Sequence, residues 1–195
     1  MPAESGHHVD MAGGSDAILV VFAHPYPRSS RACSALLAAL DGLDATEVRS
    51  LYDRYPDFDV DAVAEQEALA HAGLVVWMHP LYWYGTPGLL KHWFDTVLVK
   101  GWAFGEGGQA LARKDCLWVV TTGGDEQAFS TVGRHGHPFA DFAAPIAQTA
   151  RYCGMNWLAP HVVHDASVIS REALAATATA FRARLEAWRQ ARASR

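Results

Sequence analysis

Cysteine is scarce in this sequence, and its few thiols are poorly placed for cross-linking. The 195 residues include three cysteines, Cys33, Cys116 and Cys153, which lie far apart and form no CxxC pair. An odd number of widely spaced cysteines is typical of free thiols in a reducing compartment, not of a disulfide framework. The HExxH, GxSxG, GxxxxGK[ST] and GxGxxG patterns are absent too, which disfavours several classes of metalloenzyme, hydrolase and nucleotide-binding protein.

Long apolar runs are also missing. No run approaches the ~18 residues needed to span a membrane, and residues 1–16 lack the apolar centre of a secretory signal. That first segment holds several Gly and Ser residues, so we predict a flexible tail followed by a single domain over 17–195. We expect a soluble cytoplasmic protein.

Basic residues are outnumbered. Lys and Arg total 16 against 21 Asp and Glu, which gives a formal net charge of −5. Nucleic-acid binding depends on clustered Lys and Arg, so this composition argues against a nucleic-acid partner. The remaining basic bias lies near the C-terminus, at Arg182, Arg184, Arg189, Arg192 and Arg195. These arginines alternate with Ala and Leu, which predicts a solvated helix face.

What the sequence does contain is an alternation of short apolar runs with Ala/Leu-rich segments. The apolar runs predict strands at 17–24, 47–51, 74–79, 115–122 and 155–164. The segments between and after them predict helices at 31–41, 61–73, 87–100, 138–154 and 170–195. Ser29 or Ser30 is the natural N-cap of the first helix, and Pro160 predicts a bend in the last strand. Such alternation predicts an α/β fold with a parallel sheet and helices on both faces, and five strands fit the flavodoxin-like order 2-1-3-4-5.

Three loops are expected to meet at the carboxyl edge of this sheet, where open α/β folds bind ligands. The first carries Ser29, Ser30 and Arg31 at a helix start, a place suited to a phosphate, although Ser can also be a plain cap there. The second reads HPLYWYGTP over 79–87, and its three aromatics are suited to a planar ring, with ordinary packing as the alternative. The third, TTGG over 121–124, lets backbone approach a ligand closely. Together they favour a flat phosphorylated cofactor such as FMN.

Several segments at these loops resemble one known family. They are FAHPYPRSS, VRSLYDRYPDFDVDAVAEQEAL, VVWMHPLYWYGTPGLLKHWFD, KGWAFGEGG, WVVTTGG and YCGMNWLAP. The sequence resembles the flavodoxin-like NAD(P)H:quinone oxidoreductases of the DT-diaphorase type. SLYDRYPDFDVD is the stretch most specific to one subgroup, the ancillary flavoproteins of glutathione-regulated potassium efflux.

The resemblance implies a set of flavin contacts. Carried over position by position, they fall on His24, Ser30, Arg31, Ala32, Cys33, Leu81, Tyr82, Trp83, Tyr84, Thr121, Thr122, Gly123 and Gly124. The family's catalytic Tyr and His fall on Phe129 and His135. A phenyl ring cannot replace a phenol in hydrogen bonding, so we expect His135 to act alone or through water. Tyr84 is our second candidate catalytic residue.

The resemblance also implies cofactors and partners. Longer members bind FAD through a C-terminal extension that this sequence lacks, so FMN is favoured over FAD, with NADPH or NADH as hydride donor and a quinone or similar electrophile as acceptor. A homodimer is expected, with the 101–108 stretch (Trp102, Phe104) near the roof of the partner's site. Packing of this stretch within its own subunit is the alternative. The alternative function is a regulatory ancillary subunit that docks on a membrane potassium/proton antiporter, peripherally on the inner face of the cell membrane. The acidic segment 53–61 would then be its docking face, with an ordinary solvated loop as the alternative.

Other chemistries are disfavoured. His135 and His137, and likewise His161 and His164, form short histidine pairs, but neither pair has a carboxylate or Cys at a metal-ligand spacing. We therefore predict no metal site. Cys33 stands near a helix start, where a thiol pKa can be lowered, and a redox-sensing role for it is a weaker hypothesis.

Overall fold

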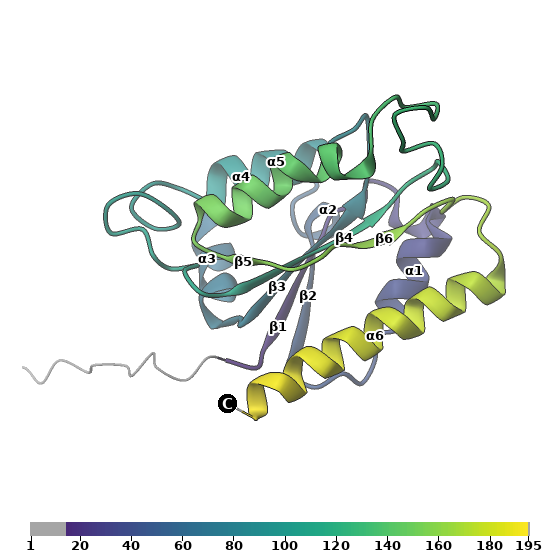
Figure 1. Cartoon of the computed structure of the whole chain (residues 1–195). Helices are drawn as coiled ribbons and strands as arrows, with labels where there is room; N and C mark the ends of the chain where they lie inside the picture. Colours follow the sequence, from purple (N-terminus) through teal and green to yellow (C-terminus); the bar gives the residue numbers. More distant parts are fainter. Residues whose placement is uncertain (1–14, 195) are drawn as a thin grey trace, which may run out of the picture.

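The computed structural model describes residues 15–194. The predicted tail therefore lies outside the described residues, except for its last two positions. Strands and helices alternate along the chain, and the strands form one sheet with helices packed on both faces (Figure 1). The strands are β1 (Ile18–Phe22), β2 (Thr46–Ser50), β3 (Leu74–Pro80), β4 (Asp115–Thr121), β5 (Asn156–Trp157) and β6 (His161–Val163). The helices are η1 (Pro27–Ser29), α1 (Arg31–Ala38), α2 (Leu51–Arg54), α3 (Ala62–His71), α4 (Gly88–Val97), α5 (Phe139–Tyr152) and α6 (Arg171–Ala193).

The sheet is parallel and its order is β2-β1-β3-β4-β5, as predicted. Every residue of β1 and β3 is buried, which is why both strands read as continuous apolar runs and not as an alternating pattern. Successive side chains still point to opposite faces. Leu19 and Val21 join the core under α3, α4 and α5, whereas Ile18 and Val20 join the core under α1 and α6.

The fifth predicted strand is interrupted. Its two ends form β5 and β6, which pair with the start and the end of the same strand, β4. Pro160 lies in the gap between them, where the chain leaves the ladder. Proline has no backbone N–H to donate to a ladder, which explains the gap. The predicted bend is confirmed, and the sheet has a short sixth strand. The prediction of a single strand over 155–164 was wrong in this respect.

The C-terminal arginines of α6 do not form a solvated face, which corrects that prediction. Four of the five arginines in the predicted cluster, Arg182, Arg184, Arg189 and Arg192, are described, and all four are half-buried. Arg182 donates to the carbonyl oxygens of Ala39 and Asp41, at 2.9 and 2.8 Å. Further along the helix, Arg184 and Arg189 also donate to backbone carbonyls, and Arg192 pairs with Asp115 at 3.4 Å. The guanidinium groups thus attach α6 to the loops at the sheet's amino edge and to the break between β5 and β6, which explains their clustering without any anionic ligand. Within residues 15–194 no helix is both long and apolar enough to cross a membrane.

Candidate functional site

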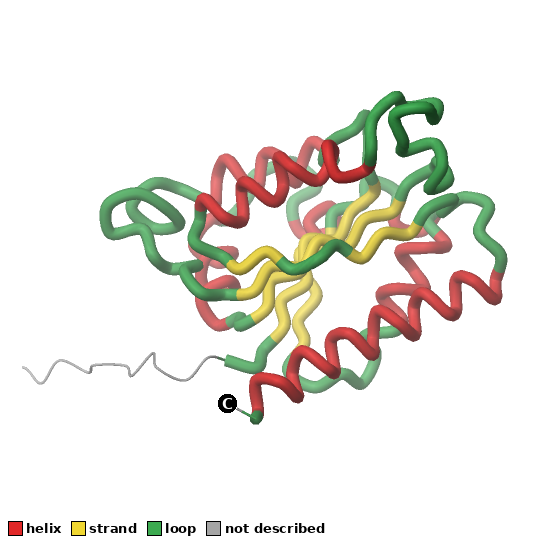
Figure 2. Tube along the Cα trace, viewed as in Figure 1, coloured by secondary structure: helices red, strands yellow, loops and turns green. Residues whose placement is uncertain are grey.

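Two neighbouring cavities open where the loops after β1, β3 and β4 meet. One has a volume of about 490 Å³ and is lined by the loops after β1 and β3. The other, of about 370 Å³, lies under the long loop between β4 and α5, which rises above the strand ends in Figure 2. Leu81, Thr122 and Gly123 line both cavities, so the two form one site of the size usual for a cofactor or substrate.

The first cavity ends at the N-terminus of α1. Ser30 is the N-cap, and its hydroxyl accepts a hydrogen bond from the amide of Cys33 at 3.2 Å. In the described part of the chain, the amides of Arg31 and Ala32 have no protein acceptor, as expected for a first helical turn. The side chains of Ala32 and Cys33 are buried, so these two residues can offer only backbone to a ligand. Free amides and the positive end of the helix dipole suit a phosphate.

His24 and Arg31 lie in the same cavity but differ in what they can offer. The His24 Nδ1 accepts from the amide of Tyr26 at 3.0 Å, so a neutral ring carries its proton on Nε2. Burial lowers the pKa of His24, which favours this neutral form. The guanidinium of Arg31 donates to the carbonyl oxygen of Ile169 at 3.3 Å, so part of its hydrogen-bonding capacity is already used.

The three consecutive aromatics form a tight turn. The amides of Tyr82 and Gly85 donate to each other's carbonyl oxygens, at 3.2 and 2.9 Å. Between them, Trp83 and Tyr84 have φ values of 47° and 64°, the left-handed region that costs a non-glycine residue about 1–2 kcal/mol. Their side chains are 93 and 51% exposed. The turn therefore points aromatic rings outward at the site, at a cost in backbone strain, which is a common feature of ligand-binding loops.

The two glycines after β4 have different roles. A side chain at Gly123 would meet no atom within 4 Å, so this position faces the open cavity. A Cβ at Gly124 would lie 3.1 Å from Nε2 of His135 and 3.3 Å from Nη2 of Arg134. Glycine at 124 thus lets the His135 ring lie close against the backbone.

His135 and Tyr84, the two predicted catalytic residues, lie together. The Tyr84 hydroxyl is 3.4 Å from Nδ1 of His135, and the two rings meet edge to face. Phe129 is buried and packs against His135, with 4.5 Å between ring centroids. Phe129, at the position where the resembled family has a Tyr, therefore packs against the His135 ring. The phenol of Tyr84 reaches the same ring from the loop after β3.

Two histidines that sequence reasoning grouped as a pair have separate roles. The His161 Nε2 lies 3.1 Å from the Thr177 hydroxyl on α6, whereas the His164 Nδ1 lies 2.9 Å from the Thr122 hydroxyl at the site. Sequence reasoning missed His164 and Arg134 as site residues, and nothing in their local pattern identifies them. Across residues 15–194 there is no group of three or more side chains suited to hold a metal ion.

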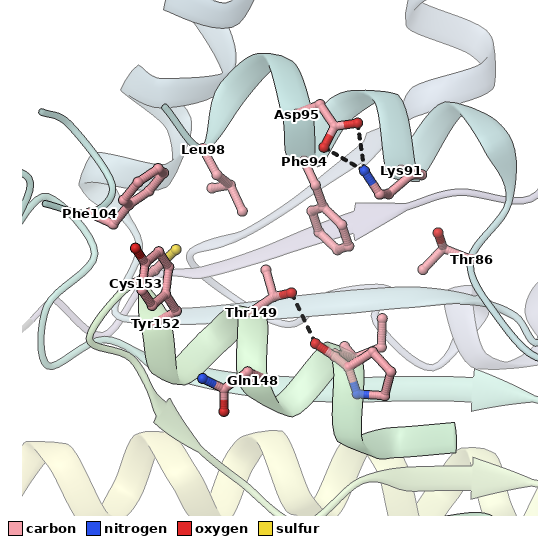
Figure 3. A pocket seen from close by; sticks show the side chains of 12 residues that line it. Thr86, Lys91, Phe94, Asp95, Leu98, Phe104, Gln148, Thr149, Tyr152 and Cys153 are labelled. Carbon is pink, nitrogen blue, oxygen red and sulfur yellow. Dashed lines mark hydrogen bonds and ion pairs between the residues drawn. The ribbon is translucent and has the colours of Figure 1, made fainter. Parts of the chain in front are cut away.

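A further cavity of about 480 Å³ lies between α4 and α5 (Figure 3). None of the predicted site residues lines it. Phe104, from the loop before β4, packs here against the exposed ring of Tyr152 at 5.0 Å. The 101–108 stretch therefore lies away from the site of its own chain, so within one chain it cannot serve as that site's roof.

The residues at the two joined cavities fit a flat phosphorylated group such as FMN. Unused amides stand at one end, exposed aromatic rings flank the middle, and an open glycine backbone lies at the other end. These are the donors and surfaces that a phosphate, a ring and its polar edge require.

Comparisons with known proteins agree with this arrangement. The model of a family described as having a flavodoxin-like fold matches residues 16–186. The glutathione-regulated potassium-efflux system ancillary protein KefF of Citrobacter koseri is 48% identical over 174 residues, which cover 89% of this chain and 98% of the relative. The general stress protein 14 of Treponema denticola, solved in complex with FMN, is 31% identical with a TM-score of 0.83, covering 88% of this chain and 98% of that one. An NADPH-quinone reductase from P. pentosaceus is 26% identical with a TM-score of 0.79, covering 87 and 97%.

Proposed function

The chain belongs to the family of proteins with a flavodoxin-like fold, and from this premise we propose that it is an FMN-dependent NAD(P)H:quinone oxidoreductase. A structural neighbour binds FMN, and another is named as an NADPH-quinone reductase. The observation that carries the proposal is the Tyr84–His135 pair beside the open backbone of Gly123 and Gly124. It provides proton donors at the end of a cavity whose other end suits a phosphate.

The chain's own residues would bind and orient FMN and would protonate the acceptor. The amides of Arg31 and Ala32, with Ser30 and the neutral His24, would hold the phosphate of FMN. Tyr82 and Trp83 would flank the ring. FMN, when bound, would supply two-electron hydride transfer between NAD(P)H and the acceptor in alternating steps.

His135 would manage the proton at the acceptor. With the Tyr84 hydroxyl donating to Nδ1, the imidazole proton is on Nε2, the atom next to Gly124. From there it can be donated to a quinone oxygen that gains negative charge, while Tyr84 replaces it from the other side. A distance of 3.4 Å is long for such a bond, and bonds of this kind shorten when substrate is present.

An absorbance spectrum of the FMN-reconstituted protein tests the proposal. Anaerobic NADPH or NADH should bleach the bound flavin, and a simple quinone should restore it. His135→Ala should slow the restoring step, whereas His137→Ala, an exposed neighbour paired with Asp141, should not. Bound flavin that stays oxidised with both nucleotides would reject the reductase function.

A homodimer belongs to the same proposal. Phe104 and the exposed Tyr152 lie together at the cavity between α4 and α5 (Figure 3), and none of the predicted site residues lines this cavity. A second copy would bring this region to the first copy's site. Sedimentation analysis should show a dimer, and a monomer with full turnover would contradict it.

A second candidate function is favoured by the relatives. The chain aligns over nearly the full length of a potassium-efflux ancillary protein, so we also propose a peripheral position at the cytoplasmic face of the membrane, on a potassium/proton antiporter. Asp53, Asp57, Asp59 and Asp61 are exposed and would contact a basic partner. Potassium efflux should rise when this chain is added to cells that carry the Citrobacter koseri efflux system without its own ancillary protein. Unchanged efflux would argue against this function.

A further inference from the structure

His164 has no part in the proposed mechanism, yet it lies directly behind the glycine backbone of the site. It follows β6 and is half-buried, with Nδ1 2.9 Å from Oγ1 of Thr122. The same hydroxyl oxygen lies 2.8 Å from the carbonyl oxygen of Gly124. Imidazole, hydroxyl and carbonyl thus form a chain of hydrogen bonds that ends on the backbone beside His135.

The proton positions in this chain follow from what each group can donate. The carbonyl of Gly124 only accepts, so the single hydroxyl proton of Thr122 is donated to it. If that proton went to His164 instead, two oxygen lone pairs would face each other at 2.8 Å with no proton between them. The hydroxyl oxygen therefore accepts from His164, whose Nδ1 carries a proton in the neutral as well as the charged ring.

The rest of the segment after β6 supports the same backbone. The amide of Thr122 donates to the carbonyl oxygen of Val163, and the carbonyl oxygen of Thr122 accepts from the amide of Ala166, both at 2.9 Å. The carbonyl of Gly124 accepts also from the amide of Asp165 at 3.1 Å, with φ of Asp165 at 53°. Within this set of backbone contacts, His164 provides a side-chain donor to the buried Thr122.

His164 also supports the proposed proton donor. Its ring lies 5.5 Å from that of Phe129, which lies 4.5 Å from that of His135. Because Phe129 is buried between the two histidines, a change at His164 is transmitted to His135 by packing.

We infer that His164 is a positioning residue: through the Thr122 hydroxyl it fixes the backbone of Gly123 and Gly124 where the polar edge of the flavin would lie, and through Phe129 it holds His135. This inference rests on the proposed function. The amides of that backbone stabilise negative charge on the reduced ring only if they are held in place. Losing the donor should therefore weaken binding of reduced FMN more than binding of oxidised FMN.

Two substitutions of His164 distinguish the effect of losing the hydrogen-bond donor from the effect of losing the volume of the ring. In His164→Asn the side-chain NH₂ takes the place of Nδ1 and can still donate to Thr122, whereas His164→Leu removes the donor. His161→Asn is the matched control, since His161 makes a similar bond to Thr177 on the other side of the sheet. The measurements are the FMN dissociation constant, by fluorescence quenching, and the midpoint potential of the bound flavin.

We expect His164→Leu to weaken binding of the reduced flavin about tenfold relative to the oxidised flavin. For a two-electron couple this lowers the potential by about 30 mV. His164→Asn should recover most of the shift, and His161→Asn should show none. If the Leu variant fails to fold, Thr122→Val removes the same hydroxyl and must show the same shift. Equal potentials in wild type and His164→Leu would overturn the inference, as would a shift that Asn does not recover.

An NMR measurement on the cofactor-free protein reports on His164 itself. The ring ¹⁵N shifts should show the neutral tautomer with its proton on Nδ1, and a proton on Nε2 would overturn the inference. Failure of the proposed function looks different: the wild-type protein would then bind no FMN, or would bind FMN that stays oxidised with both nucleotides, while the tautomer would remain as expected.

Discussion

Replacing Glu65 by Gln is expected to lower the free energy of unfolding by about 3–5 kcal/mol, the usual cost of breaking a buried ion pair. Glu65 lies on α3 and has no exposed surface. Its carboxylate accepts from Nε and Nη2 of Arg49, at 2.9 and 2.6 Å, from the hydroxyl of Tyr55 at 2.6 Å, and from Nε1 of Trp93 at 2.9 Å. Gln has nearly the same shape but is neutral, and its NH₂ group, in place of one carboxylate oxygen, cannot accept a hydrogen bond.

The cost arises mainly from the arginine that would be left behind. Burial lowers the pKa of Arg49, but its hydrogen bonds to Glu65 and Glu47 outweigh this and raise the pKa above its usual range. Arg49 therefore stays charged, with a side chain only 7% exposed. Glu47 is a partly solvated second partner of Arg49 at 2.8 Å. Because Arg49 keeps this acidic partner in the variant, the expected loss of stability is limited. For a chain of this size the loss corresponds to a fall in Tm of roughly 6–20 °C.

Urea unfolding followed by circular dichroism measures the effect. Glu67→Gln is the matched control, because Glu67 is exposed on the same helix and its loss should change stability by no more than about 0.5 kcal/mol. A loss of under about 1 kcal/mol in Glu65→Gln would refute the reasoning, since Arg49 would then have found water or another acceptor.

Three further predictions concern the site and its support. Tyr84→Phe removes the phenol beside His135 and should lower kcat for quinone reduction about five- to tenfold with FMN affinity unchanged; stopped-flow traces check both, and weaker FMN binding would point to a packing role. Ser30→Ala removes the hydroxyl that is proposed to contact the phosphate, a hydrogen bond of about 1 kcal/mol, and should weaken FMN binding roughly fivefold in a fluorescence titration; equal affinity would contradict the phosphate assignment. Burial lowers the pKa of His79 from the ordinary 6.5 of a histidine to about 4, so between these pH values the unfolded chain binds more protons and stability falls as the pH falls. The free energy of unfolding falls by about 3 kcal/mol by pH 4. In His79→Gln this part of the pH dependence should be absent, which unfolding curves recorded at several pH values will show.

The layout of the fold follows from local patterns. Strands buried on both faces read as unbroken apolar runs, as in 18–22 and 74–80, and the Ala/Leu-rich segments between them can only be crossover helices. Once the order 2-1-3-4-5 is expected, the loops after β1, β3 and β4 must share one edge. Local pattern therefore predicted which loops line the two joined cavities.

Side-chain partners distant in sequence could not be predicted in the same way. Arg182 reaches carbonyls 141 and 143 residues earlier in the chain, and a basic residue on a polar helix face carries no local sign of such a contact. Glu65 likewise looks like an ordinary helix glutamate, and its burial depends on Arg49 and Trp93 from two other elements. Such contacts are set by how the layers pack, which local periodicity does not encode.

Phe129 shows how this limit affects a functional assignment. Compared position by position with the family it resembles, the chain has lost a phenol at 129, and His135 is then expected to act alone or through water. The fold places the Tyr84 hydroxyl 3.4 Å from His135, from a position 51 residues earlier. A phenol is therefore present beside His135, but it comes from the loop after β3, while the buried ring of Phe129 packs against both His135 and His164. In the proposed mechanism, a substitution that reads as a lost hydrogen bond in the sequence is a change in which loop provides the donor.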